Sequence, residues 1–235
     1  MQPFRSEARF ESRIWDGVVA ELIDDRIVIH SAEPLRTLSN SVYRGGEATA
    51  RQFVNWRVPL TYNSDHPTRD IEQQLAEWQC EASQAVVLMT AAKLTHASIM
   101  ETENDRFRMF CLTTAGTSNA ARAGSQRKVY DAWRPGTINT FLLFDGQLGE
   151  SAMVNALMTA VEAKAAAIQD IGLRDSDNGL TATGTTTDAI VIGVSGSRTF
   201  GAIHDYAGTA TTVGAAVGRL VYETVYESVQ TQHQP

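Results

Sequence analysis

Short apolar runs fill the N-terminal and central parts of this chain, and its two long helical patterns come only near the end. Because the strands do not alternate strictly with helices, the pattern favours an α+β fold over a doubly wound parallel sheet. After a first β-hairpin at 10–30, strands are expected at 52–60, 85–89, 96–102, 107–113, 137–144 and 189–194.

Three helices are expected beside these strands. A helix at 68–80 would be capped by Thr68. The longest helix, at 151–171, ends at Gly172, and the last, at 211–229, carries Gly214 and Gly218 beside its apolar face, where they would allow close packing. The apolar stripe of the longest helix, which we expect to be buried, consists of Val154, Leu157, Met158, Val161, Ala165 and Ile168.

The bulk properties predict one domain over residues 1–235, with N-terminal hairpins, mixed sheet or sheets and late helices packed as layers. The ends, 1–5 and 230–235, are expected to fray. A net charge of −7 argues against non-specific binding of nucleic acid. There is no run long enough for a membrane helix and no signal-like segment, so we expect a cytoplasmic protein. A homo-oligomer is possible.

Familiar site motifs are absent from the sequence. It has no phosphate-binding GxxxxGK[ST] loop, no HExxH, no CxxC and no GxSxG, and its histidines share no ligand spacing, so no metal is expected. The segment 175–179 is similar to a calcium loop but has Thr186 where the bidentate Glu should be, which favours a turn. Cys80 and Cys111 are expected to be reduced thiols.

Four segments combine glycine with small polar residues: 113–119, 136–139, 182–188 and 206–211. Each lies where a predicted strand ends or a predicted helix begins. Glycine lets a backbone approach a ligand closely, and hydroxyl and amide groups bind polar ligands, so we expect a shared pocket; turn and capping chemistry is the alternative for any one segment. The candidate binding residues are Thr114, Asn119, Thr137, Asn139, Thr183, Thr185, Thr187, Tyr206 and Thr209.

Two acids are candidate catalytic residues. Glu162 and Lys164 flank the predicted apolar stripe on opposite sides, so both should be half-buried, and a half-buried Glu is a candidate general base. For Lys164, an ion pair elsewhere or a solvent-reaching chain is preferred. Asp188 opens an apolar strand after a Thr-rich loop, where it could orient a hydroxyl or water, or simply cap the loop amides.

Several of these motifs, taken in order, resemble the adenosylcobinamide amidohydrolases. The resemblance covers about residues 35 to 225, although this chain has Thr186 where glycine is common in the family. It extends the candidate site to Asn40, Gly45 and Gly46. It is carried by the segments 38–40, 45–46, 89–92, 114–120, 135–139, 162–164, 182–185, 187–188 and 206–209.

The resemblance implies hydrolysis of the amide between the aminopropanol arm of adenosylcobinamide and the corrin ring. The products would be adenosylcobyric acid and 1-aminopropan-2-ol, in salvage for coenzyme B12 synthesis. The corrinoid is then a substrate, and no cofactor is expected.

Two mechanisms remain open at the level of sequence. Glu162 or Asp188 activates a water while Thr and Asn side chains and loop amides stabilise the oxyanion, or a threonine of 183–187 attacks as a nucleophile. Water activation is preferred, because no base is visible beside a threonine. A non-catalytic corrinoid-binding protein is the alternative from another class, although no Asp-x-His-x-x-Gly motif is present.

Overall fold

Strand β3 (Arg26–Ser39) organises the sheet, because it pairs with three other strands. Its first half pairs with β2 (Val18–Ile23), its second half with β12 (Ala189–Val194), and its other edge with β4 (Gly46–Arg57). The register of β3 and β4 shifts between His30 and Leu35, at the point where β3 passes from one partner to the next. This computed structural model describes residues 1–126 and 136–235.

Within residues 1–126 and 136–235, the main sheet has nine strands and is mixed. Its path runs β1-β2-β3-β12-β9-β7-β6, with β4 and β5 attached beyond β3. The pairs β9–β12 and β4–β5 are parallel, and the others are antiparallel. The remaining strands of this sheet are β1 (Arg9–Glu11), β5 (Ala85–Thr90), β6 (Ser98–Glu103), β7 (Arg108–Ala115) and β9 (Ile138–Asp145).

Short elements complete the described part of the chain. Two small strand pairs lie outside the main sheet. Strand β10 (Gln147–Leu148) pairs in parallel with β13 (Ile203–His204), and β8 (Ala120–Ala121) pairs antiparallel with β11 (Gly184–Thr185). Single 3₁₀ turns lie at Pro3–Arg5, Ala82–Gln84 and Leu94–His96.

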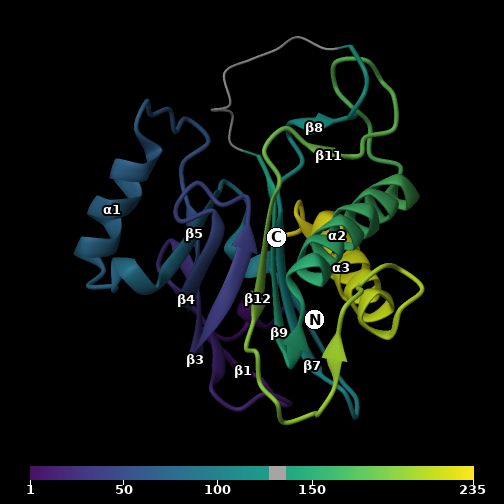
Figure 1. The fold of residues 1–235 in the computed structure, drawn as a ribbon. Helices are drawn as coiled ribbons and strands as arrows, with labels where there is room; N and C mark the ends of the chain where they lie inside the picture. The colour runs from purple at the N-terminus through teal and green to yellow at the C-terminus, as the bar shows by residue number, and fades with distance from the viewer. Residues whose placement is uncertain (127–135) are drawn as a thin grey trace.

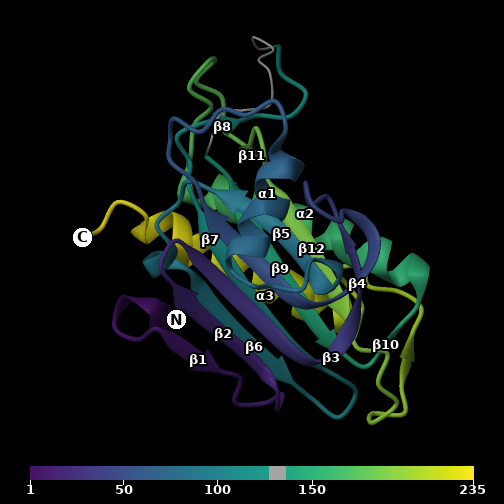
Figure 2. The same cartoon turned by 90° about the vertical axis from the view of Figure 1, so that its left-hand side faces the viewer.

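The sheet curls so that its two halves face each other, and helices cover both outer sides (Figure 1). Helix α1 (Pro67–Glu77) packs on the β4–β5 side through Ile71 and Leu75. Helices α2 (Glu150–Ile171) and α3 (Thr212–Thr231) pack side by side on the β12-β9-β7-β6 side. Between the two halves lies a second core that includes Phe53 and Phe141. Figure 2 shows the same layers from the α1 side.

The predicted α+β fold, with early hairpins, a mixed sheet and late helices, is confirmed. The hairpin turns at Asp24-Asp25, and Gly172 ends α2 in the left-handed conformation, at φ 76°. The expected cap of α1 is wrong: His66 holds that position, Pro67 starts the helix, and no side-chain cap bond forms. The strand expected at 52–60 begins earlier, at Gly46, and ends at Arg57, so Leu60 is exposed.

The predicted buried stripe of α2 is confirmed at Ile168 and wrong for three other members. Val154, Met158 and Val161 are about half exposed, at 50%, 54% and 44%. The buried face consists mostly of small residues, together with three larger ones: Ala152, Ala156, Thr159, Ala160 and Ala167, and Met153, Lys164 and Ile168. Small side chains let the helix axis approach the sheet and α3 closely, which a row of larger apolar residues would prevent.

The two ends of the chain lie near each other. The amide of Ile99 donates to the carbonyl of Met1 at 2.8 Å, and the side chain of Gln2 donates to His96 and Thr231. Within the described residues, none of the helices combines the length and apolar character needed to span a bilayer.

Candidate functional site

The site forms where the parallel strands β9 and β12 begin side by side, with Asn139 opposite Ala189. Antiparallel neighbours end there too: β7 brings Thr114 opposite Asn139, and β3 ends at Ser39, next to Val191. Strand topology therefore gathers three of the four predicted Thr/Gly/Asn segments, 113–119, 136–139 and 182–188, at one edge of the sheet.

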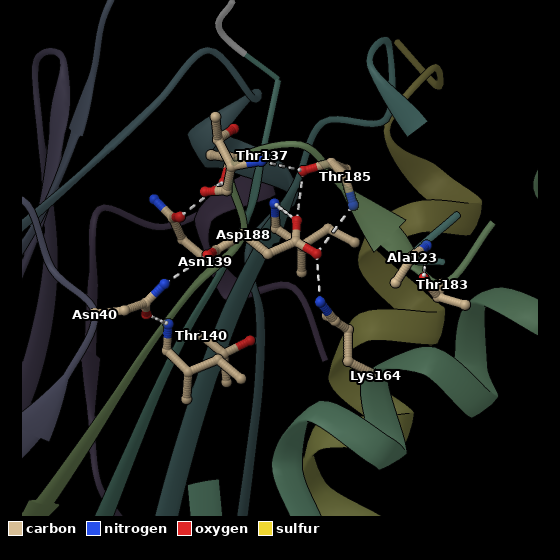
Figure 3. A network of polar contacts seen from close by, with 12 residues as sticks. Asn40, Ala123, Thr137, Asn139, Thr140, Lys164, Thr183, Thr185 and Asp188 are labelled. Atoms are coloured by element: carbon tan, nitrogen blue, oxygen red, sulfur yellow. Dashed lines mark hydrogen bonds and ion pairs between the residues drawn. The ribbon is translucent and has the colours of Figure 1, made fainter. Parts of the chain in front are cut away.

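Asp188 is the centre of this edge (Figure 3). One carboxylate oxygen accepts from the amide of Ile138 at 3.0 Å and from the hydroxyl of Thr185. The other accepts from the amide of Thr185 at 3.0 Å and from the ammonium of Lys164. Asp188 thus caps the Thr-rich loop and orients a hydroxyl at once, two roles that the sequence offered as alternatives.

Lys164 reaches Asp188 from the buried face of α2 (Figure 3). Of the two preferred alternatives for Lys164, the ion pair is confirmed and the solvent-reaching chain is wrong, as is its predicted half-burial, because both side chains are only 9% exposed. The pair passes directly over Gly184. A Cβ on Gly184 would lie 2.3 Å from the carboxylate of Asp188 and 2.8 Å from the ammonium of Lys164. Glycine at 184 is therefore required for the two charges to meet.

The carbonyl of Gly136 joins Thr185 to Thr187. The hydroxyl of Thr187 donates to it at 2.9 Å, and that of Thr185 lies 3.3 Å from it. The hydroxyl of Thr137 in turn donates to the carbonyl of Thr187 at 2.7 Å. These contacts hold the segments 136–139 and 185–188 against each other.

Asn139 connects the two halves of the sheet below the site. Its side-chain amide donates to Asn55 of β4 at 2.8 Å and to the carbonyl of Met89 in β5 at 2.9 Å. Asn55 donates to the hydroxyl of Thr114 at 2.8 Å. All of these side chains are buried, so their polar groups depend on one another for hydrogen bonds.

Asn40 continues the pairing of β3 with β12 by means of its side chain. The amide nitrogen donates to the carbonyl of Asp188, and the amide oxygen accepts from the backbone amide of Ile190, both at 2.8 Å. These two side-chain hydrogen bonds take the place of the backbone pairing that a further strand residue after Ser39 would make with β12. They fix the backbone of Asp188 at the edge of the sheet.

A pocket opens beside this network. It encloses about 140 Å³, and Gly136, Thr137, Asn139 and Thr187 form its polar wall. Tyr62 lines the pocket as well. Burial, with its hydrogen bond to Asp70, raises the pKa of Tyr62 to about 12, so this phenol stays protonated at physiological pH. The other lining residues are Asn40, Val42, Val58, Pro67, Leu88, Met89, Thr90 and Ala189.

Two predicted residues support the site from outside the pocket. The hydroxyl of Thr183 accepts from the amide of Ala123 at 2.9 Å, and Asn119 donates to Thr186 at 2.6 Å. Gly45 ends the turn between β3 and β4, and Gly46 is the first residue of β4. A Cβ on Gly45 would lie 2.2 Å from the carbonyl of Ser41, so this glycine permits a close approach of backbone to backbone.

The fourth segment, 206–211, lies elsewhere, and the expectation that it shares the pocket is wrong. Its Ala207 accepts from Thr159 and donates to Asn155, in the first half of α2, and Thr211 caps α3. Tyr206 is 75% exposed, and Thr209 is exposed as well. This loop is therefore held by helix ends on the other side of α2 from Lys164.

Glu162 shares a shallow groove between α2 and α3 with Thr209. Its side chain is exposed, so the predicted half-burial is wrong. The prediction assumed that the large apolar residues of α2 face the core, and the helix is rotated away from that orientation. The catalytic role predicted for Glu162 stays a prediction.

Sequence reasoning did not identify Asn55. This residue lies inside a strand between Val54 and Trp56, and it is fully buried. A polar residue within an apolar strand is the only available signal. Its partners, Asn139 and Thr114, are far away in the sequence, so the hydrogen bonds that explain it appear only in the folded chain.

Comparison with known proteins places the chain in one family. Residues 17–235 match the adenosylcobinamide amidohydrolases, and the chain belongs to this family. The chain is 30% identical to an adenosylcobinamide amidohydrolase of Halobacterium salinarum over 95% of this chain and 88% of that protein. A protein of that name from Methanosarcina mazei is 29% identical over 63% of this chain and 64% of its own length.

An uncharacterised protein of Methanocaldococcus jannaschii is 29% identical, over 92% of this chain and 89% of its own length.

Proposed function

We propose that this protein hydrolyses the amide joining the aminopropanol arm of adenosylcobinamide to the corrin ring. The products are adenosylcobyric acid, which re-enters coenzyme B12 synthesis, and 1-aminopropan-2-ol. The corrinoid is the substrate, and the reaction uses no cofactor. Family membership and the names of two relatives support this substrate. The observation that carries the chemistry is the hydroxyl of Thr185 donating to the carboxylate of Asp188.

The hydrogen bonds of Asp188 favour the nucleophilic mechanism over activation of a water by Asp188. A carboxylate offers about four lone-pair sites, and Asp188 already accepts from Ile138, Lys164 and twice from Thr185. No site is left for a water molecule. The proton that Asp188 is placed to take is the hydroxyl proton of Thr185. A base beside a threonine, which the sequence did not reveal, is therefore supplied by folding, and it supports the nucleophilic mechanism.

In this mechanism the Thr185 oxygen attacks the amide carbon while its proton passes to Asp188. The carbon–nitrogen bond then breaks, and the departing amine takes that proton. Water hydrolyses the resulting ester, giving one proton to Asp188, which returns it to the Thr185 oxygen. Lys164 does not react: it keeps Asp188 oriented and offsets its negative charge before and after each transfer.

Incubation of the protein with adenosylcobinamide tests the proposal. Mass spectrometry should detect the acidic corrinoid and free 1-aminopropan-2-ol in equal amounts. Unchanged adenosylcobinamide after long incubation would overturn the proposal. Tight binding without either product would favour the non-catalytic corrinoid-binding alternative.

A further inference from the structure

The pocket beside Thr187 is too small for a corrin ring. Its 140 Å³ lies below the roughly 300–1,000 Å³ of pockets that enclose drug-sized ligands, and a corrinoid exceeds such ligands. Only a narrow appendage of the substrate can enter. The macrocycle must therefore stay outside the pocket while the scissile amide approaches Thr185.

The position of the catalytic group determines which appendage enters. Thr185 does not line the pocket itself, but its hydroxyl lies 3.3 Å from the carbonyl of Gly136, which does, so the amide carbon must stand at the edge of the pocket beside Gly136. When the corrin ring lies outside the pocket and the amide carbon of the substrate lies at its polar residues, the acyl side of the amide, which leads to the ring, points outward. The part on the nitrogen side, the aminopropanol arm, points inward.

The pocket is lined by two kinds of residue, which fit the two substituents of that arm. Val42, Val58 and Leu88 present an apolar surface, as the methyl group requires. Thr137, Asn139 and Thr187 add hydroxyl and amide oxygens, which can accept a hydrogen bond from the secondary hydroxyl.

We infer that this pocket is the binding site for the leaving amine and selects a short, branched hydroxyalkyl amide. The inference rests on the proposed function. It explains how one amide is chosen on a ring that carries other amides: primary amides have no alkyl group to fill the pocket, so they gain none of its binding free energy. Val42 is the residue best placed to set the size of the occupant, because it lines the pocket yet is 52% exposed and outside the core.

The test compares two substrates with one corrin ring, adenosylcobinamide and the N-methylamide of adenosylcobyric acid. In Val42→Trp the indole should fill the pocket. We expect kcat/KM for adenosylcobinamide to fall about tenfold or more, mainly through KM, and that for the methylamide to change less than about twofold. Leu60→Trp, at an exposed position that does not line the pocket, is the matched control and should change neither.

An equal loss for both substrates, or no loss for either, would overturn the inference. Binding of N-acetyl-1-aminopropan-2-ol, followed by protein NMR, separates it from the proposed function. If the wild-type protein hydrolyses neither substrate but binds this amide, and Val42→Trp weakens the binding, the pocket assignment stands and the proposed reaction fails. If the wild-type protein hydrolyses adenosylcobinamide but Val42→Trp leaves binding unchanged, the pocket assignment fails alone.

Discussion

Lys164 and Asp188 are separated by 24 residues in sequence, and their side chains form an ion pair that is almost withdrawn from solvent. The pair fastens the middle of α2 to the start of β12. It also orients the carboxylate that accepts a hydrogen bond from the hydroxyl of Thr185. Fold and proposed chemistry therefore depend on the same contact.

Removing one partner of this ion pair should destabilise the protein strongly. In Lys164→Met, the carboxylate of Asp188 keeps its other hydrogen bonds but loses its counter-charge in a buried place. We expect the free energy of unfolding to fall by about 3–5 kcal/mol, measured by urea denaturation. The double variant Lys164→Met/Asp188→Asn leaves no unpaired charge and should recover part of the loss. A single variant as stable as the wild type would show that the pair contributes nothing.

A methyl group at position 184 should separate the same two charges. The Cβ of Gly184→Ala would lie 2.3 Å from the Asp188 carboxylate, so one of the two side chains must move. Because displacement of a catalytic group by about 1 Å can cost about 100-fold in rate, we expect a loss of that order in the hydrolysis of adenosylcobinamide. Unaltered hydrolysis by Gly184→Ala would mean that the ion pair is not needed for the reaction.

Two glycines of α3 should respond oppositely to the same substitution. A Cβ on Gly218 would meet nothing within 4 Å, so Gly218→Ala should raise the free energy of unfolding by about 0.5–1 kcal/mol through helix propensity. A Cβ on Gly214 would lie 2.0 Å from the carbonyl of Gly208, and Gly214→Ala should cost about 1–3 kcal/mol. Thermal denaturation of both variants measures the difference. Equal effects would contradict the close packing of α3 on the loop before it.

Local features of the fold could be predicted from the sequence, and the rotation of α2 could not. Strands β5, β6, β7, β9 and β12 are short apolar runs whose neighbours mark their ends. In α2, hydrophobicity favoured Val154, Met158 and Val161 as the buried face, whereas close contact with the sheet selects alanine. The size of the space available to a helix is a property of the folded chain, and the sequence pattern does not contain it.

The candidate site was predictable in part for a related reason. Glycine beside threonine marks turns at strand ends, and three such turns meet because β7, β9 and β12 are neighbours in the sheet. The fourth turn, at 206–211, has the same composition but caps α3. Composition identifies a turn, and only topology decides which turns lie together.

The two predicted acids should differ in their effect on activity. Glu162 is exposed in the α2–α3 groove, apart from the network of Asp188. We expect Glu162→Gln to keep most of the rate of adenosylcobinamide hydrolysis and Asp188→Asn to lose about 100-fold or more. Steady-state kinetics with circular dichroism as a check on folding measures both. A large loss in Glu162→Gln with a folded protein would restore the role first predicted for it.

The central claim is that Thr185 attacks the amide, and the rate of adenosylcobinamide hydrolysis in two variants of this residue tests it most directly. Thr185→Ser keeps a hydroxyl that can donate to Asp188, and Thr185→Val keeps the shape of the threonine side chain but has no hydroxyl. We predict that Thr185→Ser retains measurable turnover, whereas Thr185→Val falls by about 100-fold or more although circular dichroism shows that it is folded. Turnover by Thr185→Val within about tenfold of the wild-type rate would contradict the account and return the attack to water.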